Sequence, residues 1–280
     1  MSGWDNVKKE KPEKVKKSRR KNVKGSERTE DKVQKNVVHE SSALFTNIGD
    51  CVVSDKLKVG VYGDPGAGKS HFAASFPEPI FVIDTENRFA RLNRKFPGKD
   101  IRVMHCYAET PDGIFDPVAA LHKAEIAISA ARSMCKDGDV GTIVIDSASD
   151  IWQMSQEYMK VEHLNRDRFA LVNREGWNWG IANQRNDSII MKALVQDCHV
   201  VITGKASYDD AGLGRGTWRK DVPFQCDVIV YVQCVDSDED EEPEYRYTIE
   251  KCAENGKLQT KVVEDLDYEK LYNLVYDTTE

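Results

Sequence analysis

Short apolar runs alternate with amphipathic stretches along most of this chain. The short runs are rich in Val and Ile, which is typical of strands buried on both faces. The longer stretches carry apolar residues at helical spacing. The predicted strands cover residues 57–62, 79–84, 101–106, 142–147, 199–204, 227–235 and 244–251. The predicted helices cover residues 71–76, 89–96, 117–135, 150–163, 177–196 and 268–276.

This alternation predicts an α/β fold with a mostly parallel central sheet and helices on both faces. An acidic turn at residues 236–242 joins the last two strands and predicts an antiparallel hairpin at the edge of the sheet. We therefore expect one folded domain over residues 41–280.

Residues 1–40 differ from the rest because they are Lys-rich and poor in apolar residues, which predicts a disordered basic tail. Residues 1–36 hold 13 Lys/Arg against 6 Asp/Glu, a net charge of +7. Because the whole chain has a net charge of −7, the remaining residues carry a net charge of −14. The run from Lys14 to Lys21 can contact nucleic-acid phosphates without reading sequence. It can equally rest on the acidic body of the protein itself, and both interpretations stay open.

Composition narrows the class of protein. Of the 280 residues, 40% are hydrophobic and 31% are charged, which is typical of a globular domain with polar appendages. No apolar run approaches the ~20 residues that span a bilayer, and the N-terminus lacks an apolar secretory segment. The seven cysteines form no Cys-x-x-Cys pair. We expect a cytoplasmic protein with free thiols, no zinc site and no membrane partner.

Residues 63–70 read Gly-Asp-Pro-Gly-Ala-Gly-Lys-Ser, which fits the phosphate-loop pattern between a predicted strand and a predicted helix. Its glycines let backbone N–H groups turn towards a phosphate, and the helix N-terminus adds a partial positive charge. We expect Lys69 to reach the β- and γ-phosphates and Ser70 to hold Mg²⁺. The candidate nucleotide-binding residues are Gly63, Asp64, Pro65, Gly66, Ala67, Gly68, Lys69, Ser70 and His71.

Two other strand ends carry carboxylates. Asp146 ends an apolar strand, as in the Walker B arrangement, and is expected to support the metal. Glu86 follows the strand that ends at Asp84 and is positioned to activate water as a general base. The alternatives are that Asp146 caps the next turn, and that Asp84 and Glu86 cap the helix that follows them.

These three motifs together resemble RecA-like P-loop ATPases, in particular phage-encoded nucleotide-binding proteins such as single-strand-annealing ATPases. The resemblance covers roughly residues 57–235. It implies ATP and Mg²⁺ as cofactors, with Glu86, Lys69 and Asp146 as catalytic residues. It also implies a homo-oligomer that binds single-stranded DNA, with phage single-strand-binding or replication proteins as partners. Thr203 or Lys205 would then sense the γ-phosphate, although recombinases carry Gln at this place.

Residues 205–220 form a predicted loop rich in glycine, cations and aromatic side chains. In RecA-like proteins the matching loop contacts single-stranded DNA. The candidate contacts are Arg215, Trp218, Arg219 and Lys220. One of the cations can instead reach a neighbouring subunit's nucleotide, and an ordinary surface loop is the third interpretation.

The predicted function is therefore ATP hydrolysis coupled to single-stranded DNA binding in phage-type recombination, by annealing or strand exchange. A nucleotide-dependent assembly or replication accessory module and a small-molecule kinase are the alternatives. A GTPase is disfavoured because the chain has no Asn-Lys-x-Asp guanine-binding motif.

Overall fold

The computed structural model describes residues 45–51, 53–163, 179–235 and 244–276. The chain divides into two units, residues 1–53 and residues 54–280. In the first unit, a short 3-10 helix, η1 (Ile48–Asp50), is capped by the side chain of Asn47. The predicted basic tail at 1–40 and the acidic turn at 236–242 lie outside the described residues.

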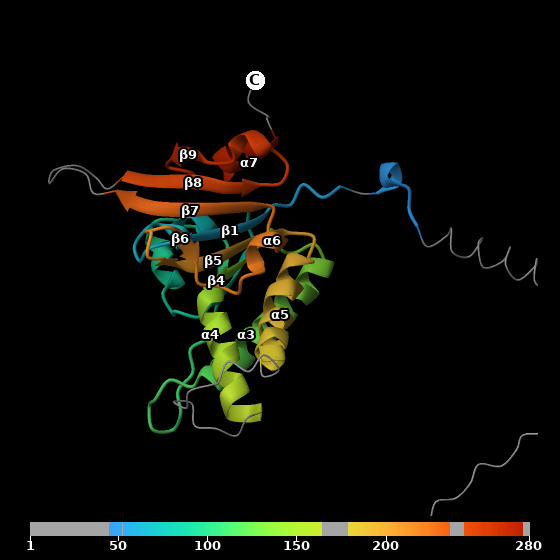
Figure 1. Ribbon diagram of the computed structural model, residues 1–280. Coiled ribbons are helices and arrows are strands. Elements are labelled where there is room, and N and C mark those ends of the chain that lie inside the picture. Colours follow the sequence, from blue (N-terminus) through green and yellow to red (C-terminus); the bar gives the residue numbers. More distant parts are fainter. Residues whose placement is uncertain (1–44, 52, 164–178, 236–243, 277–280) are drawn as a thin grey trace, which may run out of the picture. The chain divides into compact units, whose positions relative to one another are not determined.

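The second unit is built on one large sheet with the strand order β3-β2-β4-β5-β1-β7-β8-β9. Neighbours from β3 to β7 are parallel, and β8 and β9 continue the sheet in antiparallel fashion (Figure 1). The strands are β1 (Lys58–Gly63), β2 (Ile80–Asp84), β3 (Ile101–His105), β4 (Thr142–Asp146), β5 (His199–Tyr208), β7 (Val228–Val235), β8 (Glu244–Cys252) and β9 (Lys261–Glu264). This arrangement confirms the predicted α/β fold class.

Helices cover both faces because side chains alternate along each strand. In β1, Val59 and Val61 face the cluster that contains Phe72 of α2 (Lys69–Ala74) and Leu271 of α7 (Tyr268–Tyr276). On the other face, Tyr62 joins the cluster formed with α3 (Pro117–Lys136), α4 (Ala148–Tyr158) and α5 (Trp179–Leu194). These three helices lie together below the sheet in Figure 1. The 3-10 helix η2 (Phe89–Arg94) follows β2, and a π-helical turn (Met159–His163) extends α4.

The predicted loop at 205–220 contains strand residues. β5 continues to Tyr208, and β6 (Gly214–Gly216) pairs with it antiparallel, so residues 205–216 form a β5–β6 hairpin. Asp209 closes its turn by accepting hydrogen bonds from the Ala211 and Leu213 N–H groups. A short helix, α6 (Val222–Gln225), follows. The sequence pattern also missed β9, which is too short for a clear alternation and displaces β8 from the edge of the sheet.

Trp218 is a core residue rather than an exposed stacking platform. It is 6% exposed, and its ring meets that of Tyr62 edge-on at 5.7 Å between centroids. A Cβ atom added at Gly204 or Gly216 would lie 2.5 Å from this ring, so the two glycines form the slot that holds it. Trp218 also lines the cavity that contains Arg215 and Lys220, but little of its ring is free to stack on unpaired bases.

His199 is a buried residue at the start of β5, which pairs with β1, the strand that leads into residues 63–70. Its Nδ1 accepts a hydrogen bond from the Leu57 N–H at 3.1 Å, and its Nε2 lies 3.3 Å from the Tyr268 hydroxyl. Burial, reinforced by Lys56 and Lys58 and opposed by Asp55, lowers the pKa of His199 to about 4. The ring is therefore neutral at physiological pH.

We expect this histidine to make the fold acid-sensitive. Because its pKa is lower in the folded state than the ordinary ~6.5, the unfolded chain binds more protons between these values. The contribution of neutral His199 to the free energy of unfolding is complete above about pH 6.5. As pH falls towards 4, up to about 3 kcal/mol of this contribution is lost. Urea unfolding at pH 7.5 and pH 5 measures this. His199→Gln should reduce the difference, whereas the exposed His122→Gln should retain it; equal pH dependence in both variants would contradict the assignment.

Candidate active site

The loop between β1 and α2 is shaped by glycines, which are required for different reasons. A Cβ atom at Gly63 would lie 2.1 Å from the Val232 carbonyl oxygen of β7, so only glycine lets the two strands pack. Gly66 and Gly68 have φ values of 82° and 88°, in the left-handed region that glycine populates freely. A Cβ atom at Gly66 would meet nothing within 4 Å, so this part of the loop faces open space.

Lys69 begins α2 and folds back over the loop. Its Nζ donates to the carbonyl oxygens of Gly63 and Asp64, at 3.0 Å and 2.7 Å. Burial lowers the pKa of Lys69, while the carboxylates of Asp146 and Glu86 act in the opposite direction. The hydrogen-bond partners of the ammonium group are neutral loop carbonyls, and an anionic phosphate can replace them with charge-assisted hydrogen bonds.

Ser70 and Asp146 meet at the end of β4. The Ser70 hydroxyl donates to Asp146 Oδ2 at 2.8 Å, and the Thr203 hydroxyl donates to Asp146 Oδ1. Burial raises the pKa of Asp146, and these two hydrogen bonds oppose the shift. Thr203, one of the two candidate sensors, is fully buried and orients the Asp146 carboxylate instead of facing the cleft.

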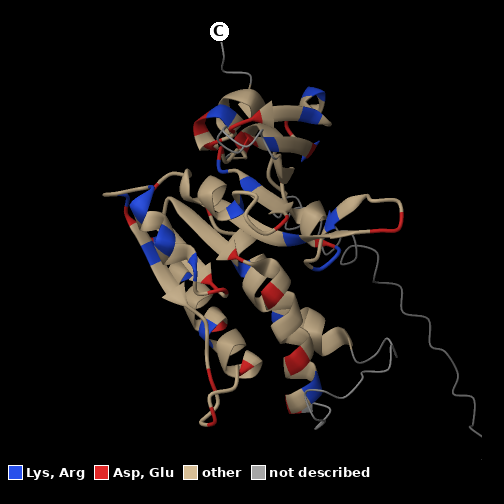
Figure 2. Ribbon diagram, turned by 90° about the vertical axis from the view of Figure 1, so that its left-hand side faces the viewer, with Lys and Arg blue, Asp and Glu red and all other residues tan. Residues whose placement is uncertain are grey.

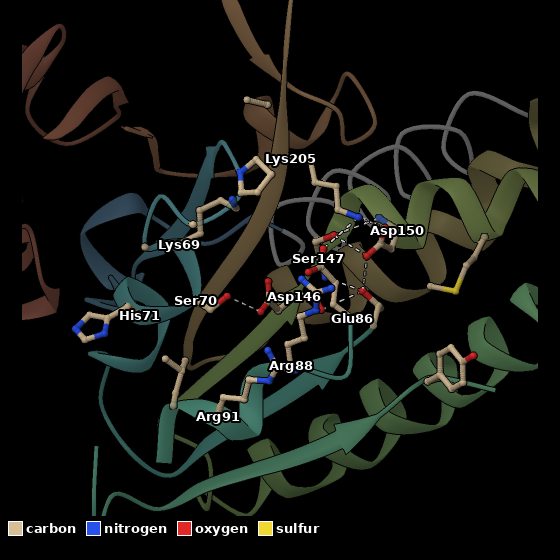
Figure 3. Close-up of a pocket in the computed structure, with 18 of the residues that line it drawn as sticks. Lys69, Ser70, His71, Glu86, Arg88, Arg91, Asp146, Ser147, Asp150 and Lys205 are labelled. Atoms are coloured by element: carbon tan, nitrogen blue, oxygen red, sulfur yellow. Dashed lines mark hydrogen bonds and ion pairs between the residues drawn. The ribbon is translucent and has the colours of Figure 1, made fainter. Parts of the chain in front are cut away.

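Glu86 lies beside Lys205, the other candidate sensor. Lys205 Nζ is 3.1 Å from Glu86 Oε1 and 2.6 Å from Asp150 Oδ1. Burial alone would lower the pKa of Lys205, but the two carboxylates raise it above its ordinary value. The candidate base and the candidate sensor are therefore partners across one cleft (Figure 3).

Asp84, in contrast, is structural. Its buried carboxylate accepts hydrogen bonds from the Glu86 and Phe89 N–H groups, at 3.2 Å and 3.0 Å. This is the capping role that the sequence left open for Asp84. It fixes the turn that presents Glu86 to the cleft.

One cleft of about 900 Å³ gathers most of the predicted residues. It lies at the carboxyl ends of the parallel strands, where open α/β sheets bind ligands. From the predicted set it is lined by Pro65, Gly66, Gly68, Lys69, Ser70, His71, Glu86, Asp146 and Lys205. The Asp64 side chain is held elsewhere, because its carboxylate accepts a hydrogen bond from the Tyr208 hydroxyl of the β5–β6 hairpin at 2.6 Å.

Sequence reasoning missed other residues of the cleft. Arg88, the N-cap residue of η2, and Arg91 of η2 line it together with Asp150 of α4. The signal was available, since two arginines follow Glu86 at short spacing. Figure 3 shows both arginine side chains extending towards the region of Ser70 and Asp146.

The residues present fit a nucleoside triphosphate and Mg²⁺. The open glycine cradle offers backbone donors, and the Ser70 hydroxyl and the Asp146 carboxylate are the oxygen donors that Mg²⁺ takes near phosphates. Among the described residues, no group of three or more His, Cys, Asp or Glu side chains could hold a metal ion without such a ligand. The cleft volume of about 900 Å³ is also within the range of small-molecule binding sites.

The predicted nucleic-acid contacts do not lie in this cleft. Arg215 and Lys220 are exposed and line a second cavity of about 500 Å³, which also contains Tyr62 and Glu250. Arg219 is held by Asp187 and Asp221, with only 18% of its side chain exposed. The guanidinium group of Arg219 thus already has two carboxylate partners, unlike the exposed side chains of Arg215 and Lys220.

The described elements show basic and acidic residues interspersed, and the basic excess of residues 1–36 lies outside them (Figure 2). None of the described helices combines the length and apolar character needed to cross a membrane.

Comparison with known proteins assigns the family. A crystal structure of the RadB recombinase aligns with a TM-score of 0.46 and 12% identity, covering 78% of this chain and 89% of that chain. No curated protein matches the sequence. A family model described as an AAA domain, AAA_24, matches residues 55–260, a range that includes the phosphate loop, Glu86, Asp146 and the β5–β6 hairpin. This chain therefore belongs to the AAA_24 family of AAA domains.

Proposed function

We propose that this protein binds Mg²⁺–ATP on residues 63–70 and hydrolyses it with Glu86 as the general base. The family is one of P-loop ATPases. The observation that carries the proposal is that Lys69, Ser70, Glu86 and Asp146 line the same cleft, although they come from three separate parts of the chain. Bound Mg²⁺ would neutralise charge on the phosphates, and Ser70 and Asp146 are the residues that would hold it.

The chain's own residues supply the remaining chemistry. Loop N–H groups and Lys69 bind and orient the phosphates, and Glu86 accepts a proton from the attacking water at its carboxylate. Thr203 and Ser70 hold Asp146 in place. Lys205 pairs with Glu86 in the structure, and we propose that it moves to the γ-phosphate and frees the carboxylate for the water.

Lys205→Ala is expected to lower kcat for ATP hydrolysis by about 10- to 100-fold, because one charge-assisted contact to the γ-phosphate is lost. ADP affinity should change little, since ADP lacks that phosphate. Lys257→Ala, an exposed lysine on η5 (Gly256–Leu258), is the control. Steady-state turnover and ADP binding check this; higher turnover in Lys205→Ala would mean that Lys205 only inhibits Glu86.

We further propose that single-stranded DNA is the partner that regulates hydrolysis, in an oligomer that serves phage-type recombination in the host cytoplasm. The support is the exposed cations, Arg215 on the β5–β6 hairpin and Lys220 after it, and the basic run at residues 14–21. The hairpin also contacts the phosphate loop through Tyr208 and Asp64, which gives DNA binding a route to the nucleotide.

The experiment is ATP hydrolysis by the full chain with and without single-stranded DNA, at several salt concentrations. We expect stimulation by DNA, a reduced stimulation in the double variant Arg215→Ala/Lys220→Ala, and weaker DNA affinity with a smaller salt dependence when residues 1–36 are removed. Hydrolysis that no nucleic acid stimulates would favour the small-molecule kinase or the assembly module. No hydrolysis despite ATP binding would favour the assembly module alone.

A further inference from the structure

Four cationic side chains line the cleft, and they differ in what they contact. Lys69 donates to two loop carbonyls, and Lys205 is paired with two carboxylates. The side chains of Arg88 and Arg91 make no hydrogen bond or ion pair with any residue that the structure describes. They are the uncommitted positive charges of this site.

The arginines are nevertheless held on a fixed support. Phe89 between them is 1% exposed, and its N–H donates to the buried Asp84 carboxylate at 3.0 Å. The Arg91 N–H donates to the Arg88 carbonyl oxygen at 3.1 Å, which closes the first turn of η2. The backbone of η2 is therefore anchored to the core, while both guanidinium groups extend into the cleft (Figure 3).

We propose that Arg88 and Arg91 form a second phosphate-binding subsite, which contacts phosphate oxygens of the nucleotide held by the loop of the same subunit. This rests on the proposed function. Guanidinium groups remain charged at all physiological pH values and match phosphate oxygens with two parallel donors. Arg88 follows the base Glu86 by two residues and lines the same cleft, so in this proposal it contacts the phosphate that the water attacks.

The ligand class follows from the charge of the site. A Mg²⁺–triphosphate complex keeps net negative charge, and charge spreads over the equatorial oxygens of the transferred phosphoryl group as it leaves. Lys69 alone faces it from the loop. Arg88 and Arg91 supply the missing charge without a residue from another subunit, a role for which Arg219 is unavailable because Asp187 and Asp221 hold it.

The test compares Arg88→Ala, Arg88→Lys and Arg91→Ala with Arg94→Ala. Arg94 is an exposed arginine of the same helix that does not line the cleft, so it is a matched control. We expect Arg88→Ala to lower kcat for ATP hydrolysis by about 100- to 1000-fold and Arg91→Ala by about 10-fold. Arg88→Lys should recover part of this, because a lysine keeps the charge and loses the paired donors. Arg94→Ala should stay within about twofold of the unchanged protein.

Binding of ADP with aluminium fluoride separates this proposal from the proposed function. Arg88→Ala should weaken binding of this transition-state mimic far more than binding of ADP alone. That comparison needs no turnover, so it still reports on the arginines if the unchanged protein proves not to hydrolyse ATP. Unchanged binding of the mimic in both arginine variants would overturn the proposal.

A mixing experiment tests whether the arginines act within one subunit. Arg88→Ala protein is combined with Lys69→Ala protein, each of which lacks one half of the site. Because both halves belong to the same chain in the proposal, the mixture should hydrolyse no more ATP than the two variants measured separately. Recovered activity would mean that Arg88 serves a neighbouring subunit's nucleotide and would contradict the assignment.

Discussion

Replacing Glu86 by Gln is expected to lower kcat for ATP hydrolysis by about 10²- to 10⁴-fold, which is the usual contribution of a positioned general base. The amide is nearly the same size as the carboxylate, but it accepts a proton poorly. The exposed position of Glu86 and its ion pair with Lys205 mean that the change removes no core packing. ATP should therefore still bind, with a Kd within a few-fold of the unchanged protein.

Two controls make this result specific. Glu254→Gln changes an exposed glutamate outside the cleft and should leave turnover unaltered. A thermal unfolding scan shows whether the Glu86 variant remains folded. Turnover that persists in Glu86→Gln would move the base to another residue, and Asp150 is then the nearest carboxylate in the cleft that shares Lys205.

Lys69→Ala has the second large effect, and it acts on binding as well as on turnover. Among the described residues, Lys69 Nζ donates hydrogen bonds to the two loop carbonyls alone, which leaves it ready to contact the β- and γ-phosphates. Hydrogen bonds to charged groups contribute about 1.5–3 kcal/mol, so the Kd for ATP should rise by about 10- to 100-fold. Turnover should fall by about 10²-fold or more even at saturating ATP.

Titration calorimetry with ATP and Mg²⁺ measures the first part, and steady-state kinetics measures the second. Lys257→Ala again serves as the control for loss of one exposed positive charge. If Lys69→Ala binds ATP as tightly as the unchanged protein, the nucleotide does not sit on the loop at residues 63–70.

The sequence predicted the parts of the fold that depend on local patterns. The strands at the centre of the sheet and helices such as α3 carry strong periodicity along the chain. The glycine spacing of residues 63–70 likewise predicted a loop between β1 and α2. Each of these features is specified by neighbouring residues.

Features that depend on distant contacts were not predictable. Whether Lys205 pairs with Glu86, or Tyr208 with Asp64, depends on how strands more than a hundred residues apart come together. Trp218 looked exposed in a glycine-rich stretch, but those glycines form the slot that buries it. Arg88 and Arg91 differ from these cases, because their short spacing after Glu86 was a local signal. They were overlooked because an arginine at or on a short helix is usually a solvated surface residue.

A crystal structure of the full chain with Mg²⁺, ADP and aluminium fluoride tests the central claim most directly. The account predicts that the β-phosphate rests on the N–H groups of residues 63–70, with the metal beside Ser70 and Asp146. Glu86 should contact the water aligned with the fluoride, and Lys205 should have left Glu86 for the fluoride itself. A nucleotide bound away from the loop, or Glu86 turned out of the cleft with no water beside it, would contradict the account.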